Sequence, residues 1–592
     1  MAHDERPGDA AADRRLRATA DRLLLRMTWR GGHWAALLAV ASIIGAAADI
    51  AFPAVTGHTV DLVLRTAGRP AGSPGPGDPA GPWLAGCAAL IALIVACSAA
   101  GQLATGMSTA AGTRWIRQRL VGHVFDAGLR LAGRFGDGDL VSRLVGSTAD
   151  AGAGPAGGVL AVAAVIAPVG SIVALALIDP WLAVAFAVGM PLLAVVLRSF
   201  VRDVSDNTVR YQAAQGAIAA RLLDALAGAR TIAAAGSRDQ ETARVLVPLA
   251  EVRRHGRAFW RIQARVAARG SLIVPLLQVV VLAVAGLELA AHRISPGELL
   301  AASQYAVIGA GVGAAIGRLS QVGRARAGAR RVAEPLAEPA THHGTTALPP
   351  GPGRLELSGI TMRAGGDLVL DGLDATVPGG ALVAVVGRSG AGKSMLAAVA
   401  GRLLDPDQGE VRLDGVPLAS LDAAALRRAV VYAFDRPMLV GGTLREAIAF
   451  GATCPAPARL LAAARDASAA EFIQLLPAGL DTPLAQAPMS GGEIQRIGLA
   501  RAFAHADQAR LLILDDATSS LDTVTEMRVS ASLTGHFSGC TRLIISSRAA
   551  TAARADLVAW LDGGRLRALA PHDKLWLDPG YRAVFAPEMA DA

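Results

Sequence analysis

One glycine-rich segment has the residue types that hold a nucleotide phosphate. Residues 387–394 read GRSGAGKS, a G-x-x-x-x-G-K-S pattern, between the apolar run ALVAVV and the helix-like run MLAAVAGRLL. Glycines let backbone N–H groups point at phosphate oxygens, and a helix that begins there adds the positive end of its dipole. In such a loop Lys393 reaches the β- and γ-phosphates and Ser394 ligates Mg²⁺. The predicted nucleotide-binding residues are Gly387, Arg388, Ser389, Gly390, Ala391, Gly392, Lys393, Ser394 and Met395.

A second segment supplies a carboxylate for the metal. Residues 511–516 read LLILDD, an apolar strand-like run that ends in two acids. Mg²⁺ is usually held by one or two carboxylates together with substrate phosphates. Asp515, at the end of a buried strand, is therefore predicted to hold Mg²⁺ with Ser394. Mg²⁺ is thus one predicted cofactor.

A third segment makes a family resemblance specific. Residues 489–496 read MSGGEIQR and open the helix-like run IGLARAF, so a second anion site is expected at a helix start. Lys393, Ser490 and Asp515 follow one another with separations of 97 and 25 residues. This order resembles the cassette of ABC proteins, in which SGGE-x-QR is the signature motif.

The resemblance implies a dimer. In that family two cassettes pair head to tail, and each ATP lies between the phosphate loop of one chain and the signature of the other. It therefore implies that Ser490, Gly491 and Gly492 bind the partner's ATP. Asp522, in the SSLD segment, matches the loop that spans the family's dimer.

Several positions depart from the family pattern. The family's catalytic Glu, which polarises the attacking water, is replaced by Asp516. A glutamine is replaced by Asp435 in YAFDRP, and the switch histidine by Ser547 in ISSR. Residues 354–370 contain no aromatic, and Ala364 stands where one usually stacks on adenine. The implied catalytic positions are Asp516, Lys393, Asp435 and Ser547, and the implied Mg²⁺ ligands are Ser394, Asp435 and Asp515.

These departures predict a site that binds ATP and hydrolyses it poorly. The shorter carboxylate of Asp516 moves the water contact by roughly 1.5 Å, and misplacement by about 1 Å can cost about 100-fold in rate. Lys393, Ser394 and Asp515 remain, so Mg-ATP binding is expected to persist. We expect an asymmetric heterodimer whose partner supplies a full catalytic set. A homodimer with two weak sites is the alternative.

The rest of the chain has the composition of a membrane protein. Of 592 residues 52% are hydrophobic and 18% charged, and the mean hydropathy is +0.41. That excludes a disordered chain and predicts two or more domains. Because a bilayer span needs about 20 apolar residues, six are predicted, at about 32–62, 83–111, 155–178, 180–200, 268–290 and 298–320.

Arginine placement predicts the orientation. The segment between the fourth and fifth spans carries thirteen arginines, and the one between the second and third carries six. Positive-inside bias then places these segments and both termini in the cytoplasm, with the chain in the plasma membrane. The net charge of +8 reflects these arginines, so no nucleic-acid partner is expected. Residues 21–30 read as an amphipathic helix at the inner interface.

Six spans before one cassette resemble a half-size ABC exporter. The predicted fold is multidomain, an all-α six-helix transmembrane domain plus an α/β P-loop NTPase domain. The boundaries are a disordered N-terminus at 1–20, the transmembrane domain at 21–330, a linker at 331–352 and the nucleotide-binding domain at 353–592. The resemblance implies export of a small amphipathic molecule. The alternatives are a lipid flippase, a siderophore-type importer, or an ATP-binding membrane regulator without transport.

Two acids lie in or near the predicted spans. Asp49 is inside the first, and Glu288 is near the outer end of the fifth. Intramembrane acids usually face a cavity or a partner group, so they are candidates for attracting a cationic or polar substrate. The alternative for Asp49 is a structural pair with a residue such as His58. For Glu288 a solvated interfacial position is favoured.

Overall fold

The computed structural model describes residues 7–30, 32–67, 81–451 and 455–585. The chain forms two compact units, which are described separately. The first comprises the residues up to Phe125 together with Phe135–Glu338. The second comprises Asp126–Arg134 together with the residues from Pro339 onward.

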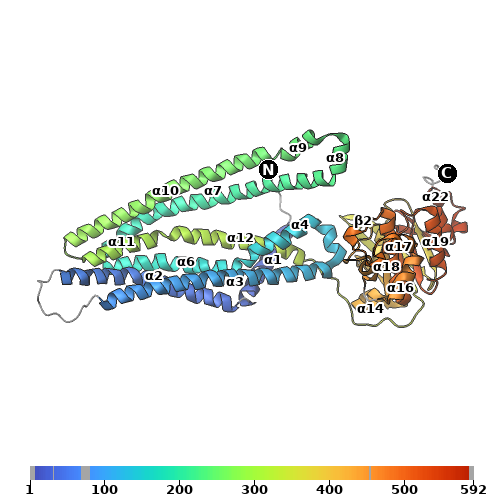
Figure 1. The fold of residues 1–592 in the computed structure, drawn as a ribbon, viewed down its shortest axis with the longest axis horizontal. Coiled ribbons are helices and arrows are strands. Elements are labelled where there is room, and N and C mark those ends of the chain that lie inside the picture. Colours follow the sequence, from blue (N-terminus) through green and yellow to red (C-terminus); the bar gives the residue numbers. More distant parts are fainter. Residues whose placement is uncertain (1–6, 31, 68–80, 452–454, 586–592) are drawn as a thin grey trace. The chain divides into compact units, whose positions relative to one another are not determined.

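The described residues of the first unit are almost all helical. Their long helices are α1 (Pro7–Arg30), α2 (Gly32–Ala67), α3 (Gly81–Arg134, whose last turns from Asp126 onward belong to the second unit), α6 (Gly154–Ile178), α7 (Pro180–Ala227), α10 (Leu249–Ala290), α11 (Pro296–Ala310) and α12 (Val312–Leu336). Shorter helices connect them: α4 (Asp137–Ser142), α5 (Thr148–Gly152), α8 (Ala229–Ala235) and α9 (Arg238–Leu246). Figure 1 shows α7 and α10 side by side, with α8 and α9 at one end of the pair.

A helix lies at each of the six predicted spans. Within the described residues, three segments are long and apolar enough to cross a membrane: Gly32–Thr66, Gly81–Leu131 and Gly138–Ile178. Pro180–Gly189 and Pro275–Ala290 are shorter apolar stretches, in the predicted fourth and fifth spans. The predicted sixth span is divided between α11 and α12 at Gly311.

Glycines bring α2 and α11 close together. A Cβ atom on Gly57 would lie 2.5 Å from the carbonyl oxygen of Gly297, so only hydrogen fits there. The carboxylate of Asp61 accepts hydrogen bonds from the Gly297 N–H at 2.8 Å and from the Ser295 hydroxyl. Small residues let membrane helices approach at backbone distance.

Two interruptions divide the helices outside the predicted spans. After α4 the chain continues as a π-helix over Arg143–Ser147. Arg143 is buried and binds the carboxylates of Asp139, at 2.7 Å, and Glu334, at 2.5 Å. The second interruption falls at Gly228, where α7 ends before α8.

The carboxylate of Glu288 forms an ion pair, whereas that of Asp49 has no partner among the described residues. The Glu288 carboxylate lies 3.1 Å from the Arg293 guanidinium and is 12% exposed. The solvated position expected for Glu288 is therefore wrong, because its carboxylate is mostly covered and paired with Arg293. Asp49 is half-buried on α2, and the described residues include no hydrogen-bond or ion-pair partner for its carboxylate.

Two predicted boundaries are wrong. Residues 7–20 belong to α1 and are not disordered, because most of them are Ala and Arg, which are strong helix formers. Residues 331–336 are the last turns of α12, so the linker does not begin at 331. Thr346 forms a β-bridge with Leu421, so residues before 353 already pack on the second unit. Residues 1–6 and 586–592 lie outside the described residues.

The second unit is α/β, as predicted. An antiparallel sheet of order β2-β1-β4-β5 contains β1 (Leu355–Ala364), β2 (Asp367–Val377), β4 (Gln408–Leu413) and β5 (Val416–Pro417). The central sheet has the order β10-β9-β3-β8-β7-β6. Its strands are β3 (Leu382–Val386), β6 (Val430–Phe434), β7 (Leu511–Asp515), β8 (Thr541–Ile545), β9 (Leu557–Asp562) and β10 (Arg565–Ala570), all parallel except β10.

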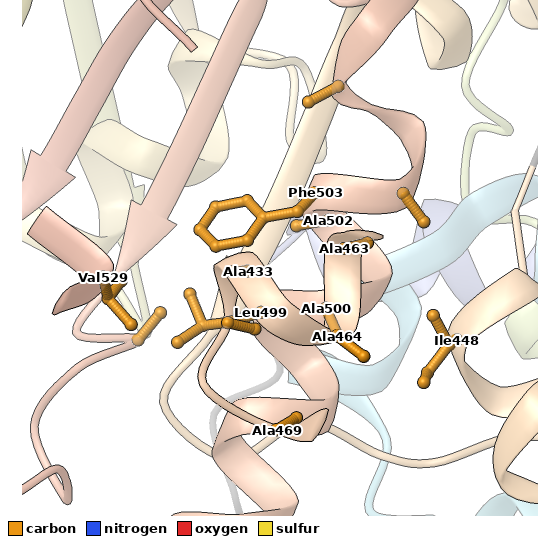
Figure 2. Packing of buried hydrophobic residues seen from close by; sticks show 14 of the residues in the cluster. Ala433, Ile448, Ala463, Ala464, Ala469, Leu499, Ala500, Ala502, Phe503 and Val529 are labelled. Carbon is orange, nitrogen blue, oxygen red and sulfur yellow. The ribbon is translucent and has the colours of Figure 1, made fainter. Parts of the chain in front are cut away.

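Helices cover this sheet and complete a large apolar core. They are α13 (Lys393–Ala400), α14 (Ala423–Ala429), α15 (Leu444–Ala449), α16 (Pro457–Asp466), α17 (Ala470–Leu475), α18 (Gly491–His505), α19 (Thr523–Thr534), α20 (Ala549–Ala553), α21 (His572–Leu575) and α22 (Pro579–Arg582). Figure 2 shows the ring of Phe503 on α18 among alanines that include Ala463 of α16. Because alanine side chains are small, α16 and α18 pack closely beside this large ring.

Candidate nucleotide-binding site

The sheet topology brings the predicted site residues to one edge. Strands β6, β7, β8 and β3 are parallel neighbours, so their carboxyl ends meet there. The glycine-rich loop follows β3, Asp435 follows β6, Asp515 ends β7, and Ser547 follows β8 by two residues. In open α/β sheets ligands bind at this edge.

The glycine-rich loop has the backbone that its sequence predicts. Gly390 and Gly392 have φ angles of 82° and 93°, which side chains rarely allow. Lys393 begins α13, and its ammonium donates hydrogen bonds to the carbonyls of Gly387 at 2.8 Å and Arg388 at 3.1 Å. The lysine charge thus lies within the loop. Of the remaining loop residues, Ser389 is exposed, Ala391 buried and Met395 partly buried.

Two oxygen ligands suited to Mg²⁺ lie together. The Ser394 hydroxyl donates a hydrogen bond of 2.9 Å to Oδ1 of Asp515. Burial raises the pKa of the Asp515 carboxyl above its ordinary value. Hydroxyl and carboxylate oxygens are hard ligands of the kind that Mg²⁺ takes alongside phosphates. The pair therefore fits the metal.

Asp516 adopts an unusual backbone conformation. Its φ angle is 49°, in the left-handed region where Asp is among the few tolerated side chains. Burial, and then the neighbouring Asp515, raise the pKa of its carboxyl. The carboxylate thus lies beside the metal-ligand pair, with a proton affinity above that of an ordinary aspartate.

The buried amide of Gln495 joins the loops around this edge. The side chain is 1% exposed and comes from the second turn of α18. Its Nε2 donates to Oδ1 of Asp435 at 3.2 Å and to the Asp516 carbonyl at 3.2 Å. It also lies 3.1 Å from the Ser519 hydroxyl, and its Oε1 accepts from the Ser520 N–H at 3.0 Å. The sequence interpretation missed this residue, although it is the Gln of SGGE-x-QR.

Asp435 and Ser547 occupy different surroundings. Oδ1 of Asp435 accepts from the Ser519 hydroxyl as well as from Gln495, so this carboxylate is tied to the loop after β7. Ser547 is exposed beyond β8. Its neighbour Arg548 binds the Ser519 carbonyl at 3.0 Å and pairs with Glu526. The predicted catalytic positions are thus gathered at one edge, although Ser547 points into solvent.

The signature residues form a separate exposed surface. Ser490 and Glu493 cap the start of α18 reciprocally, with the Ser490 hydroxyl accepting from the Glu493 N–H at 3.3 Å. A Cβ on Gly491 would meet no atom within 4 Å. Asp522 caps α19 and is exposed. Among the described residues, no hydrogen bond joins Ser490, Gly491 or Gly492 to the glycine-rich loop.

Comparison with known families agrees with this arrangement. Residues 36–310 match the model of the ABC transporter transmembrane region, and residues 370–519 match that of the ABC transporter cassette. The chain belongs to the ABC transporters, with one helical membrane domain and one ATPase cassette. ABC exporters function as dimers, and the membrane location follows from the same domains.

Individual relatives cover much of the chain. It is similar to the ABC transporter ATP-binding protein RamA of Streptomyces coelicolor, with 48% identity over 93% of this chain and 84% of the relative. An ATP-dependent lipid A-core flippase of Pseudomonas fluorescens is 32% identical over 67% of this chain and 66% of its own. The structure of a bacterial Atm1-family ABC exporter with ATP bound has the same fold, with a TM-score of 0.75, 22% identity, and coverage of 95% and 98%.

Restoring the usual catalytic carboxylate is not expected to make this site hydrolyse ATP rapidly. In the assembled transporter, Asp516→Glu should raise hydrolysis at this chain's own site by no more than about tenfold, because Asp435, Ser547 and Ala364 stay unchanged and catalytic residues act as a unit. The assay is ATP turnover in transporters whose partner lacks its catalytic carboxylate. If this single change restored the turnover of a transporter with an unaltered partner, then the carboxylate alone was missing from this chain's site.

Proposed function

We propose that this chain exports a small amphipathic molecule across the plasma membrane as the weakly hydrolysing subunit of an asymmetric dimer. The observation that carries the proposal is the intact pairing of Ser394 with Asp515 beside Lys393, combined with the changed residue Asp516. ATP binding is retained by this arrangement and hydrolysis is impaired.

The residues at this edge of the sheet have proposed roles in binding ATP. Lys393 and the N–H groups of residues 387–395 hold the ATP phosphates at the start of α13, and Ser394 and Asp515 hold Mg²⁺ with those phosphates. Mg²⁺ supplies charge neutralisation at the transferring phosphoryl group. Asp516 is too short to align the attacking water, and Ser547 has no imidazole to contact the γ-phosphate. Asp435 is held by Ser519 and Gln495 and orients the loop after β7.

The partner's ATP is proposed to bind at Ser490, Gly491 and Gly492. The exposed start of α18 offers backbone N–H groups and a helix dipole to a phosphate. Asp522 caps α19 near the same dimer surface. In this proposal a second cassette completes each site, in keeping with the dimers that ABC exporters form. We favour a partner with an unaltered catalytic Glu and His.

A lipid flippase is the second candidate. It is favoured by the similarity to the Pseudomonas fluorescens flippase over two thirds of this chain. Whether the chain is an exporter or a flippase, its arginine-rich segments favour a cytoplasmic position for both termini. ATP turnover in reconstituted transporters, measured with and without candidate amphipathic molecules and lipids, separates the two. Turnover that no candidate changes, in vesicles that move none of them, would favour a regulator.

The chain purified without its partner should bind Mg-ATP but hydrolyse it at least about 100-fold more slowly than the assembled transporter, because its water-positioning contact is displaced. Binding is measured by fluorescence of a nucleotide analogue, and turnover by phosphate release. A Lys393→Ala chain serves as the control for specific binding. Brisk steady-state hydrolysis by the single-chain preparation would contradict the proposal.

A further inference from the structure

A basic and aromatic groove lies between α1 and α3, in the helical unit. It has a volume of about 520 Å³ and is lined by Arg22, Leu25, Arg26, Trp29, Arg30, Trp115 and Arg119. The lining therefore combines four guanidinium groups, two indoles and one aliphatic side chain. The groove lies in a different compact unit from the nucleotide site.

The two faces of α1 have opposite characters. Ala20, Leu23 and Met27 are buried in an apolar cluster with residues of α3, α5 and α12. Leu25 and Trp29, on the groove side, are 62% and 86% exposed. An exposed tryptophan and leucine in a row of arginines are not explained by packing within this unit.

The arginines of the groove have no acidic partner among the described residues. Arg22, Arg26 and Arg30 are spaced four residues apart on α1, where like charges repel one another. The guanidinium of Arg119 lies 5.6 Å above the ring of Trp115. Over the described part of the chain, no acidic side chain forms an ion pair with any of these four arginines. The groove therefore has the electrostatics of an anion site.

The groove lies where apolar helix segments begin. Residues 32–48, directly after α1, carry no charge, and neither do residues 81–113 of α3, which end just before Trp115 and Arg119. The apolar start of α2 thus follows the basic α1, and within α3 the apolar stretch gives way to basic residues at the groove. Arginine and tryptophan at such a boundary are typical of the headgroup level of a bilayer.

We propose that this groove binds an anionic phospholipid of the cytoplasmic leaflet. The arginines bind the phosphodiester, since guanidinium groups match phosphate oxygens with paired hydrogen bonds. Trp29 and Leu25 contact the glycerol and the upper acyl chains. The exposed apolar residues favour a lipid over free phosphate, which would gain nothing from them. Basic pockets between membrane helices on the cytoplasmic side bind such headgroups.

The test measures lipid binding to the full-length chain, purified in detergent in the assembly that it forms. Native mass spectrometry counts adducts of palmitoyl-oleoyl phosphatidylglycerol, of phosphatidylcholine with the same chains, and of inorganic phosphate. The triple variant Arg22→Gln, Arg26→Gln and Arg30→Gln should weaken phosphatidylglycerol binding on the order of 100-fold, because each juxtamembrane charge contributes severalfold to affinity for anionic lipid. Phosphatidylcholine binding should be weak in both proteins.

A matched control separates the groove from general charge. Arg253→Gln, Arg257→Gln and Arg261→Gln remove three exposed arginines with the same spacing from α10, more than ten residues from its apolar stretch at Pro275–Ala290. Phosphatidylglycerol binding should stay within about twofold of wild type. A Lys version of the groove variant, which keeps the charge, should restore most of the binding and exclude misfolding as the cause.

Three results would overturn the proposal. The first is an equal loss of binding in the α10 control. The second is binding of phosphatidylcholine to the wild-type protein as strong as that of phosphatidylglycerol. The third is displacement of bound phosphatidylglycerol by inorganic phosphate.

Discussion

In a transporter assembled with a catalytically complete partner, Gly491→Asp is expected to lower ATP turnover about 1000-fold. The substitution places a carboxylate at the start of α18, where we propose that the partner's ATP phosphates dock. Juxtaposed like charges cost several kcal/mol. A Cβ at Gly491 meets no atom within 4 Å, so the substitution should leave the fold of this chain intact.

Gly491→Ala is the matched control, because it adds the same Cβ without the charge and should keep most of the turnover. Lys393→Ala should weaken nucleotide binding at this chain's own site and reduce turnover less than Gly491→Asp does. The measurement is ATP hydrolysis and vesicle transport by each assembled variant. Abolished hydrolysis in Lys393→Ala, with normal hydrolysis in Gly491→Asp, would reverse the assignment of the two sites.

The second large effect is on stability. Phe503→Ala should destabilise the nucleotide-binding unit by about 3–5 kcal/mol, the usual range for removing a buried aromatic ring. The ring is fully buried, stacks on Phe537 at a centroid distance of 4.5 Å, and lies among small alanines that cannot fill the space (Figure 2).

Phe450→Ala is the control, since its side chain is 53% exposed and its loss should change stability little. Thermal unfolding of the full-length variants in detergent, followed by tryptophan fluorescence, makes the comparison. The cassette tryptophans Trp560 and Trp576 report on the unit that contains Phe503. Equal unfolding temperatures for the two variants would contradict the packing argument.

Most of the fold and the phosphate loop could be predicted from local sequence. The GRSGAGKS segment needs glycines at the two positive φ angles, so its residue types and its backbone are linked directly. The strand that ends at Asp515 is five residues long and almost wholly buried, which an unbroken apolar run predicts. Charge-free runs likewise located the membrane helices because a bilayer requires their length.

Features that depend on distant partners escaped prediction. Gln495 is near Asp435 and Asp516 only after strands far apart in the sequence have paired. Arg143 forms an ion pair with Glu334, which lies 191 residues further along the chain. The helix at 7–20 was missed, although the helix propensities of its alanines and arginines favour order.

The amide of Gln495 has a consequence for how such a chain can diverge over generations. The side chains of Asp516 and Ser547 are half-buried and exposed and make no hydrogen bond to Gln495, so substitutions there change chemistry with little effect on folding. At Gln495, loss of the amide would strand buried polar groups at about 1–3 kcal/mol each. A lineage can therefore lose hydrolysis one residue at a time while selection on folding alone preserves the frame of the site.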